Sequence, residues 1–266
     1  MSGHGAKRLK PGESRGGVLR QVEPGSFRVE HPLVVNVKDG SVLVQVSAGA
    51  FEMGSNESEG NVNEHPRHRV ELSAYWIGVY AVTNAQYLRF VQATGHRAPD
   101  NSRHLEKVLG EHPVTDVSWD DSLAYASWAG CELASEAQWE CACHGPLGLA
   151  YPWGEGWDET KCRNDKNKGN ELTEVVYGYA KGVSGWGTYN QSGNVLEWCA
   201  DWYDENYYAS SLKEDPKGPQ QGPCRVFRGG SWRYVDPGFF RAAYRTWYDP
   251  ASRGGGLGLR LVREAS

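Results

Sequence analysis

The first regular pattern along the chain is a pair of β-branched runs, HPLVVNV at 31–37 and SVLVQVSAG at 41–49. They are separated by Lys38, Asp39 and Gly40. An Asp-Gly pair between two such runs is typical of a two-residue hairpin turn. The pattern therefore predicts that a β-hairpin opens the folded region.

Three later segments carry the signature of a capped helix: a Ser or Thr followed three residues on by Gln or Asp, then an apolar stretch and a glycine. The predicted caps and closing glycines are Thr83 with Gln86 and Gly95, Ser118 with Asp121 and Gly130, and Ser135 with Gln138 and Gly145. Tyr87, Phe90 and Val91 share one face of the first helix, and Leu123 and Trp128 supply the apolar contacts of the second. From Tyr151 onward no helical period is present, which predicts irregular loops joined by short strands.

The composition favours one loop-rich domain. Only 39% of residues are hydrophobic, yet the chain has 11 Trp, 14 Tyr and 33 Gly, which indicates aromatic plugs between loops rather than a helical bundle. Residues 1–25 have almost no apolar content and are predicted to be a flexible tail. We expect residues 26–266 to form a single domain.

Charge and hydropathy exclude two classes of partner. The net charge of -5 gives no basic field, so nucleic acid is not expected to bind. No apolar run reaches about 18 residues, and the basic N-terminus has no apolar stretch behind it, so neither a membrane span nor a secretory signal is predicted. The expected location is the cytoplasm, with surface display by another route left open.

The six cysteines are expected to be thiols, because no export signal is predicted. Cys141 and Cys143 form a C-x-C within the third predicted helix. Side chains two residues apart on a helix point in different directions, so this pair is not expected to share a metal ion.

Eight blocks in order resemble the formylglycine-generating enzyme and sulfatase-modifying-factor family. They are FEMGS at 51–55, AYWIGVYAVTNAQYLRF at 74–90, HPVTDVSWDDSLAYASWAG at 112–130, SEAQWECAC at 135–143, YPWGE at 151–155, SGNVLEWCADWY at 192–203, RVFRGGSW at 225–232 and LGLRLV at 257–262. The resemblance implies an α+β, C-type lectin-like fold with little regular secondary structure. In that fold, short helices surround a small twisted antiparallel sheet, and the ligand face is built late in the chain.

The catalytic members of this family bind copper through two cysteines that follow the Gly-Gly-Ser block. Those places fall at Tyr234 and Phe239, and no cysteine follows Cys224. Copper(I) needs soft sulfur ligands, so the resemblance implies a protein that is not an enzyme and binds no copper. The iron site of the related sulfoxide synthases is not matched by any histidine either; the nearest pair, His65 and His68, lies in a polar loop.

One metal site is retained in the resemblance. Asn190, Gly193, Val195 and Glu197 match the family loop in which oxygen atoms coordinate a structural calcium ion. The alternative is a tight turn ahead of Trp198, in which Asn194 and Glu197 only form hydrogen bonds.

The end of the chain resembles the variable proteins of diversity-generating retroelements, which implies that residues 225–266 form a variable ligand-binding region. The positions expected to be framework are Gly229, Gly230, Ser231, Trp232, Arg241, Arg245, Pro250, Arg253, Gly258 and Arg260. The predicted ligand-binding residues are Arg233, Tyr234, Val235, Gly238, Phe239, Phe240, Tyr244, Thr246, Trp247, Tyr248, Gly254, Gly255 and Gly256. Large rings give contact area at low entropic cost, and the glycines leave a flat or concave spot beside them. We expect about half of these rings to face solvent, with Trp232 and Phe240 filling the core.

The leading hypothesis is a non-catalytic, receptor-like protein whose ligand is another protein or a cell-surface component. One alternative is an oxidoreductase of the formylglycine-generating or sulfoxide-synthase type. Another is an accessory subunit or structural modulator that pairs with a catalytic partner.

Overall fold

The computed structural model describes residues 31–100, 109–170 and 172–265 in full. Ahead of them it describes the course of three short strands, β1 (Ser14–Arg15), β2 (Leu19–Glu23) and β3 (Ser26–Val29). Apart from β1 and β2, the tail predicted over 1–25 lies outside the described residues.

The larger sheet has six strands in the order β1-β4-β5-β8-β14-β9, and every neighbouring pair is antiparallel. Its further strands are β4 (Leu33–Val35), β5 (Val42–Val46), β8 (Tyr75–Gly78), β9 (Glu132–Leu133) and β14 (Leu261–Glu264). The predicted opening hairpin is confirmed, because β4 pairs with β5 across a turn in which Gly40 has a φ of 74°. The last strand, β14, lies beside β8, so both ends of the domain meet in one sheet.

A second sheet has four strands in the order β12-β11-β10-β13. They are β10 (Leu196–Trp202), β11 (Arg225–Arg228), β12 (Arg245–Tyr248) and β13 (Leu257–Leu259). The predicted α+β fold of short helices around antiparallel strands is confirmed, with one departure: the strands form two main sheets, and β13 runs parallel to β10. The cause is that the chain crosses from the edge strand β12 to the opposite edge before it forms β13.

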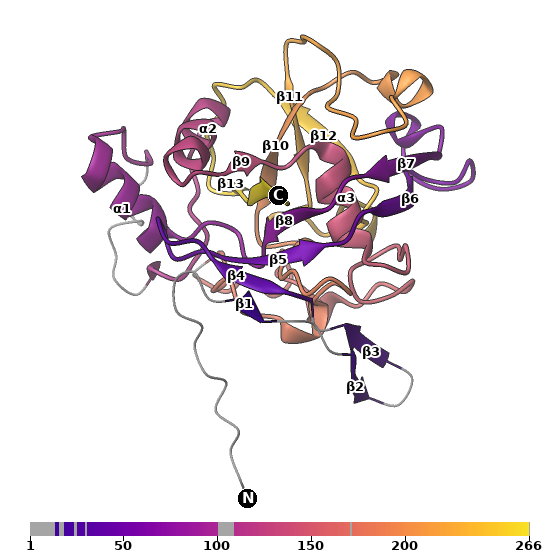
Figure 1. Cartoon of the computed structure of the whole chain (residues 1–266), viewed down its shortest axis with the longest axis horizontal. Coiled ribbons are helices and arrows are strands. Elements are labelled where there is room, and N and C mark those ends of the chain that lie inside the picture. The colour runs from indigo at the N-terminus through magenta and orange to yellow at the C-terminus, as the bar shows by residue number, and fades with distance from the viewer. Residues whose placement is uncertain are drawn as a thin grey trace, which may run out of the picture.

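The three predicted helices are confirmed as α1 (Asn84–Thr94), α2 (Trp119–Trp128) and α3 (Glu136–His144), each with the predicted capping box. The role given to Leu123 is wrong, because its side chain is exposed while Tyr125 and Ala126 form the buried face of α2. Figure 1 shows α3 beside the hairpin of β6 (Gly49–Met53) and β7 (His68–Leu72), and α3 also contacts β10 and β11. Among the residues described after Tyr151, the only helical segments are short 3-10 turns: η4 (Glu159–Lys161), η5 (Ala180–Gly182), η6 (Tyr207–Ser210) and η7 (Pro237–Phe240).

The core is aromatic, as the composition predicted. Trp139 and Trp198 are completely buried in two separate clusters, and Phe240 anchors a third. All six cysteines are free thiols, and burial raises the pKa of both Cys141 and Cys162 to about 12. None of the helices in the described part of the chain is long and apolar enough to cross a membrane.

Candidate ligand-binding face

Five arginines near the end of the chain each form an ion pair with a carboxylate that lies earlier in the sequence. The pairs are Arg228 with Glu140, Arg241 with Glu64, Arg245 with Glu136, Arg253 with Asp121, and Arg260 with Glu197. We call these five arginines the anchor arginines. Because every acid belongs to an element formed earlier in the chain, the pairs fix the position of the late loops on the rest of the fold.

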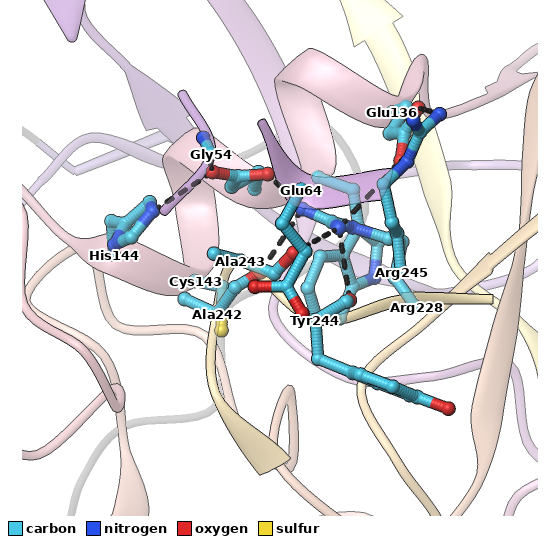
Figure 2. A network of polar contacts seen from close by, with 12 residues as sticks. Gly54, Glu64, Glu136, Cys143, His144, Arg228, Ala242, Ala243, Tyr244 and Arg245 are labelled. Atoms are coloured by element: carbon cyan, nitrogen blue, oxygen red, sulfur yellow. Dashed lines mark hydrogen bonds and ion pairs between the residues drawn. The ribbon is translucent and has the colours of Figure 1, made fainter. Parts of the chain in front are cut away.

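Arg228 is the most deeply placed of them. Its guanidinium contacts Glu140 and donates hydrogen bonds of 3.0, 2.9 and 2.9 Å to the three successive carbonyls of residues 242–244. Burial raises the pKa of Glu140, but Arg228 and His144 outweigh burial and lower that pKa to about 2. Figure 2 shows this network, with the ring of Tyr244 pointing away from it. The arginine therefore holds the backbone of residues 242–244 in place.

Arg245 fixes the start of β12. Its Nε and Nη2 atoms donate to the two carboxylate oxygens of Glu136 at 2.7 Å each, and its Nη1 donates to the Asn63 carbonyl at 3.0 Å. Such a bidentate pair sets orientation as well as distance. A buried ion pair at the first residue of β12 therefore sets the direction of the strand that carries Trp247 and Tyr248.

Arg241 fixes the end of η7 in the same way. Its Nη1 and Nη2 atoms each lie 2.8 Å from a Glu64 oxygen, and Nη1 also donates to the Ser55 hydroxyl at 2.9 Å. Burial raises the pKa of Glu64, yet the hydrogen bonds and charge of Arg241 more than offset it and hold the pKa below its ordinary value.

Between the anchors, three aromatic rings form a continuous row. The Tyr234 and Phe239 ring centroids are 4.9 Å apart, and those of Phe239 and Tyr244 are 5.1 Å apart. Burial, and after it the neighbouring Tyr244 and Tyr248 hydroxyls, raises the pKa of Tyr234 to about 12. The two positions that resemble the copper cysteines thus do lie together, and they hold a phenol and a phenyl ring.

The predicted ligand-binding residues divide by exposure. Four are exposed, namely Arg233, Val235, Trp247 and Tyr248; six are half-buried, namely Tyr234, Gly238, Phe239, Thr246, Gly254 and Gly255; and three are buried, namely Phe240, Tyr244 and Gly256. Burial of Trp232 and Phe240 confirms the prediction that they fill the core.

The three buried positions correct the prediction of direct ligand contact. Phe240 lies under Trp157, with ring centroids 4.8 Å apart, and has no exposed surface. Tyr244 is only 8% exposed, because Phe239 covers its ring. Gly256 is buried because its carbonyl accepts a hydrogen bond from the backbone of Leu196.

The exposed members lie in two groups rather than in one patch. Trp247 stacks on Tyr203, with centroids 4.2 Å apart, at the free edge of the second sheet. Arg233 lies over the Trp232 ring, and a Cβ atom added at Gly255 would come within 3.6 Å of its guanidinium. The glycines therefore adjoin Arg233, as expected for a flat spot.

This face is not a deep cavity. A cavity of about 720 Å³ lies elsewhere, between the β4–β5 hairpin, the start of α1 and Tyr177. None of the predicted ligand-binding residues lines it. The late loops therefore present side chains on an open surface, which suits a large partner better than a small enclosed molecule.

The predicted calcium loop fits its metal only in part. Asn190 Oδ1 is buried without a hydrogen-bond partner, so this oxygen is free to accept a ligand. Glu197, in contrast, accepts from Arg260 at 2.7 and 2.8 Å and from the Trp139 indole at 2.7 Å. Arg260 already neutralises this carboxylate, which would have to share its oxygens with a calcium ion, and the calcium role given to Glu197 stays a prediction.

The calcium roles of Gly193 and Val195 stay predictions, as does that of Asn190. The turn alternative does not describe Asn194, whose side chain bonds the distant backbone of Glu174 at 2.9 and 3.0 Å rather than the turn ahead of Trp198.

Comparison with known proteins agrees with this geometry. The family model described as sulfatase-modifying factor enzyme 1-like domain matches residues 32–265. The formylglycine-generating enzyme of Streptomyces coelicolor is 34% identical, over 84% of this chain and 89% of that protein. The serine/threonine-protein kinase Pkn1 of Chlamydia trachomatis is 33% identical over 84% of this chain, which spans only 38% of that kinase.

Two solved structures are similar. PvdO from Pseudomonas aeruginosa superimposes with a TM-score of 0.75 at 25% identity, covering 88% of this chain and 98% of that one. Treponema denticola variable protein 1 gives a TM-score of 0.70 at 22% identity, covering 94% and 99%. The second likeness concerns the fold alone.

Proposed function

Because this chain belongs to the sulfatase-modifying factor enzyme 1-like family and has its C-type lectin-like fold, we propose that it is a non-catalytic member that binds a macromolecular ligand. The ligand would be a protein or a cell-surface component. The side chains that would contact it are those exposed between the anchor arginines, chiefly Arg233, Val235, Trp247 and Tyr248.

One observation carries this proposal: Tyr234 and Phe239 occupy the two places that resemble the copper cysteines, and their rings are in contact. A phenol and a phenyl ring cannot donate a thiolate to copper(I). One thiol, Cys162, belongs to the apolar cluster against which these rings pack, and it is 1% exposed. Its burial raises the pKa of the thiol to about 12, so it stays protonated and inert at neutral pH.

The exposed residues support recognition of a large partner. Trp247 and Tyr248 are 42% and 46% exposed, and Val235 is 50% exposed. Rigid aromatic side chains on open surfaces are typical of interfaces in which ring contact supplies the affinity. The anchor arginines hold the backbone between them, so the loops lose little further entropy when a partner binds.

The binding experiment uses three forms of the full chain: the wild type, a face variant and a matched control. The face variant carries Val235→Ser, Trp247→Ser and Tyr248→Ser. The control carries Val37→Ser, Leu147→Ser and Leu212→Ser, which replace apolar side chains elsewhere that are even more exposed, at 74%, 80% and 66%. Each form is immobilised and challenged with cell-surface proteins from the native host.

A partner retained by the wild type and the control but lost from the face variant supports the proposal. Equal retention by all three forms, or a loss confined to the control, contradicts it. Circular dichroism spectra of the three forms establish that each is folded.

The enzymatic alternative is favoured by one finding, the 34% identity to a formylglycine-generating enzyme over most of both chains. An oxidase of this type would consume oxygen when mixed with copper(I) and a cysteine-bearing peptide. We expect oxygen uptake at the background of the peptide alone. Turnover above that background would favour the alternative over the binding proposal.

A further inference from the structure

Asp201, at the end of β10, is a buried acid with no counter-ion. It is 3% exposed, and its Oδ2 atom accepts a hydrogen bond of 2.8 Å from the backbone N–H of Glu136. Among the residues that the structure describes, no Lys, Arg or His lies within ion-pair distance of it. A buried carboxylate without such a partner is costly to ionise.

The groups that face Asp201 come from five elements and one loop. They are Glu136 of α3, Cys199 of β10 itself, Tyr207 of η6, Arg225 and Arg245 of β11 and β12, and Lys217 of the loop before β11. Arg245 is the cation best placed to balance the charge of Asp201. Its two hydrogen bonds to a carboxylate, however, are already made to Glu136.

Glu136 lies within ion-pair distance of two guanidiniums, Arg245 at 2.7 Å and Arg228 at 3.6 Å, whereas Asp201 lies within ion-pair distance of neither. Burial first, and the charge of Glu136 second, raise the pKa of Asp201 to about 7. At lower pH Asp201 is neutral and does not repel Glu136. Once Asp201 ionises, its charge repels that of Glu136, and the Glu136–Arg245 contact weakens.

The consequence falls on the candidate face, because Arg245 is the first residue of β12. Thr246, Trp247 and Tyr248 follow it directly, at the free edge of the second sheet. The Arg245 guanidinium also lies 5.0 Å from the ring of Tyr203, on which Trp247 stacks. If Arg245 is held less firmly, both β12 and the stacked pair of Trp247 and Tyr203 become more mobile.

We propose that Asp201, in its neutral acid form, is a positioning residue for the ligand-binding face, acting through Glu136 and Arg245 on β12. Loss of its proton loosens the strand that carries Trp247 and Tyr248. The importance of this for binding rests on the proposed function, but the loosening itself is a property of the unliganded protein and is tested without a ligand.

The direction of the pH effect follows from proton linkage. When β12 opens and hydrates Asp201, the acid returns to an ordinary pKa near 3.8, so opening releases a proton between about pH 4 and 7. The opening equilibrium therefore rises with pH across this window, by up to about tenfold per pH unit, and levels off above 7. The strand that carries the face therefore opens least at acidic pH.

The experiment is hydrogen exchange of the full chain at pH 5, 6 and 7, with each rate divided by the intrinsic rate at that pH. We expect opening at the Thr246, Trp247 and Tyr248 amides to increase at least tenfold from pH 5 to 7. Asp201→Asn, which mimics the neutral acid, should reduce that change to less than about twofold. Asp204→Asn, an exposed acid near the end of the same strand, is the control and should behave as the wild type.

Amides of α1, such as those of Phe90 and Val91, serve to separate local opening of β12 from global unfolding. Their opening free energy should be the same at all three pH values. An equal rise at α1 and β12, or a flat wild-type profile at β12, overturns the proposal.

If Asp201→Asn does not fold, the carbon chemical shift of the Asp201 carboxyl in the wild type decides. A titration midpoint near 7 supports the proposal, and one near 4 overturns it. If no partner is captured but the opening of β12 still depends on pH, the proposed function is rejected and this inference is retained.

Discussion

Within residues 225–261, two sets of side chains alternate and have opposite environments. The anchor arginines at 228, 245 and 260 are fully buried and paired with acids from earlier in the chain. The side chains between them, such as Val235 and Trp247, reach solvent. The contrast indicates that buried ion pairs, rather than aromatic packing, determine the position of the late loops. Substitutions should therefore divide into costly and nearly neutral ones within a single short segment.

The largest effect is expected at Arg228. Arg228→Ala would remove the arginine partner of the buried Glu140 and release the carbonyls of residues 242–244, so we expect a loss of about 3–5 kcal/mol in the free energy of unfolding. Urea unfolding measures it. Arg233→Ala, which removes an exposed arginine five residues on, should cost less than about 0.5 kcal/mol. Equal costs at the two positions would end the distinction between anchors and displayed residues.

A smaller loss is expected at Gly230, which fixes the turn after β11. Its φ is 70°, and an added Cβ would lie 2.7 Å from the Phe239 carbonyl oxygen. Gly230→Ala should therefore cost about 2 kcal/mol. At Gly255, where the nearest atom would be 3.6 Å away, alanine should be tolerated within about 0.5 kcal/mol. Thermal unfolding of both variants tests the pair, and a tolerated Gly230→Ala would contradict the close approach.

Arg241→Ala should cost about 1–2 kcal/mol, because this anchor is partly exposed. It should also change the acid sensitivity. The stability that Glu64 gains from Arg241 is present above its ordinary pKa of 4.5 and is lost as pH falls through the lower folded value. Between pH 6 and 3 the wild type should therefore lose more stability than the variant. Identical acid profiles would show that the pair contributes nothing measurable.

The smallest effects on stability are expected on the face itself. Trp247→Ala removes a ring that stacks on Tyr203 and should cost about 1 kcal/mol, and Val235→Ser should cost less than about 0.5 kcal/mol. Differential scanning fluorimetry checks both. A loss comparable to that of Arg228→Ala would mean that these side chains support the fold instead of displaying a surface.

Local signals in the sequence predicted the local structure well. The Ser and Thr caps, the closing glycines and the hairpin at Asp39-Gly40 are determined by residues within a few positions of each other, and all were confirmed, although residues 36–41 rather than two residues connect β4 to β5. The framework assignments at Arg241, Arg245, Arg253 and Arg260 also agree with the anchors, although Arg228 was not among them.

What the sequence did not reveal depends on contacts between distant residues. Arg241 and Glu64 are separated by 177 positions, and no periodicity marks such a pair. The calcium pattern at Glu197 records oxygen atoms and could not show that Arg260 also pairs with this carboxylate. The parallel β13 strand and the cover of Phe239 over Tyr244 likewise arise only once the loops are packed.

The central claim is that two rings stand where copper ligands would be needed. Copper(I) affinity, measured by competition with a chromophoric chelator, tests it when the wild type is compared with Tyr234→Cys/Phe239→Cys. The account predicts no copper(I) bound specifically by the wild type and tight binding by the double variant, whose two thiols would replace rings now 4.9 Å apart. Tight copper(I) binding by the wild type, accompanied by oxygen uptake with a cysteine-bearing peptide, would contradict the account.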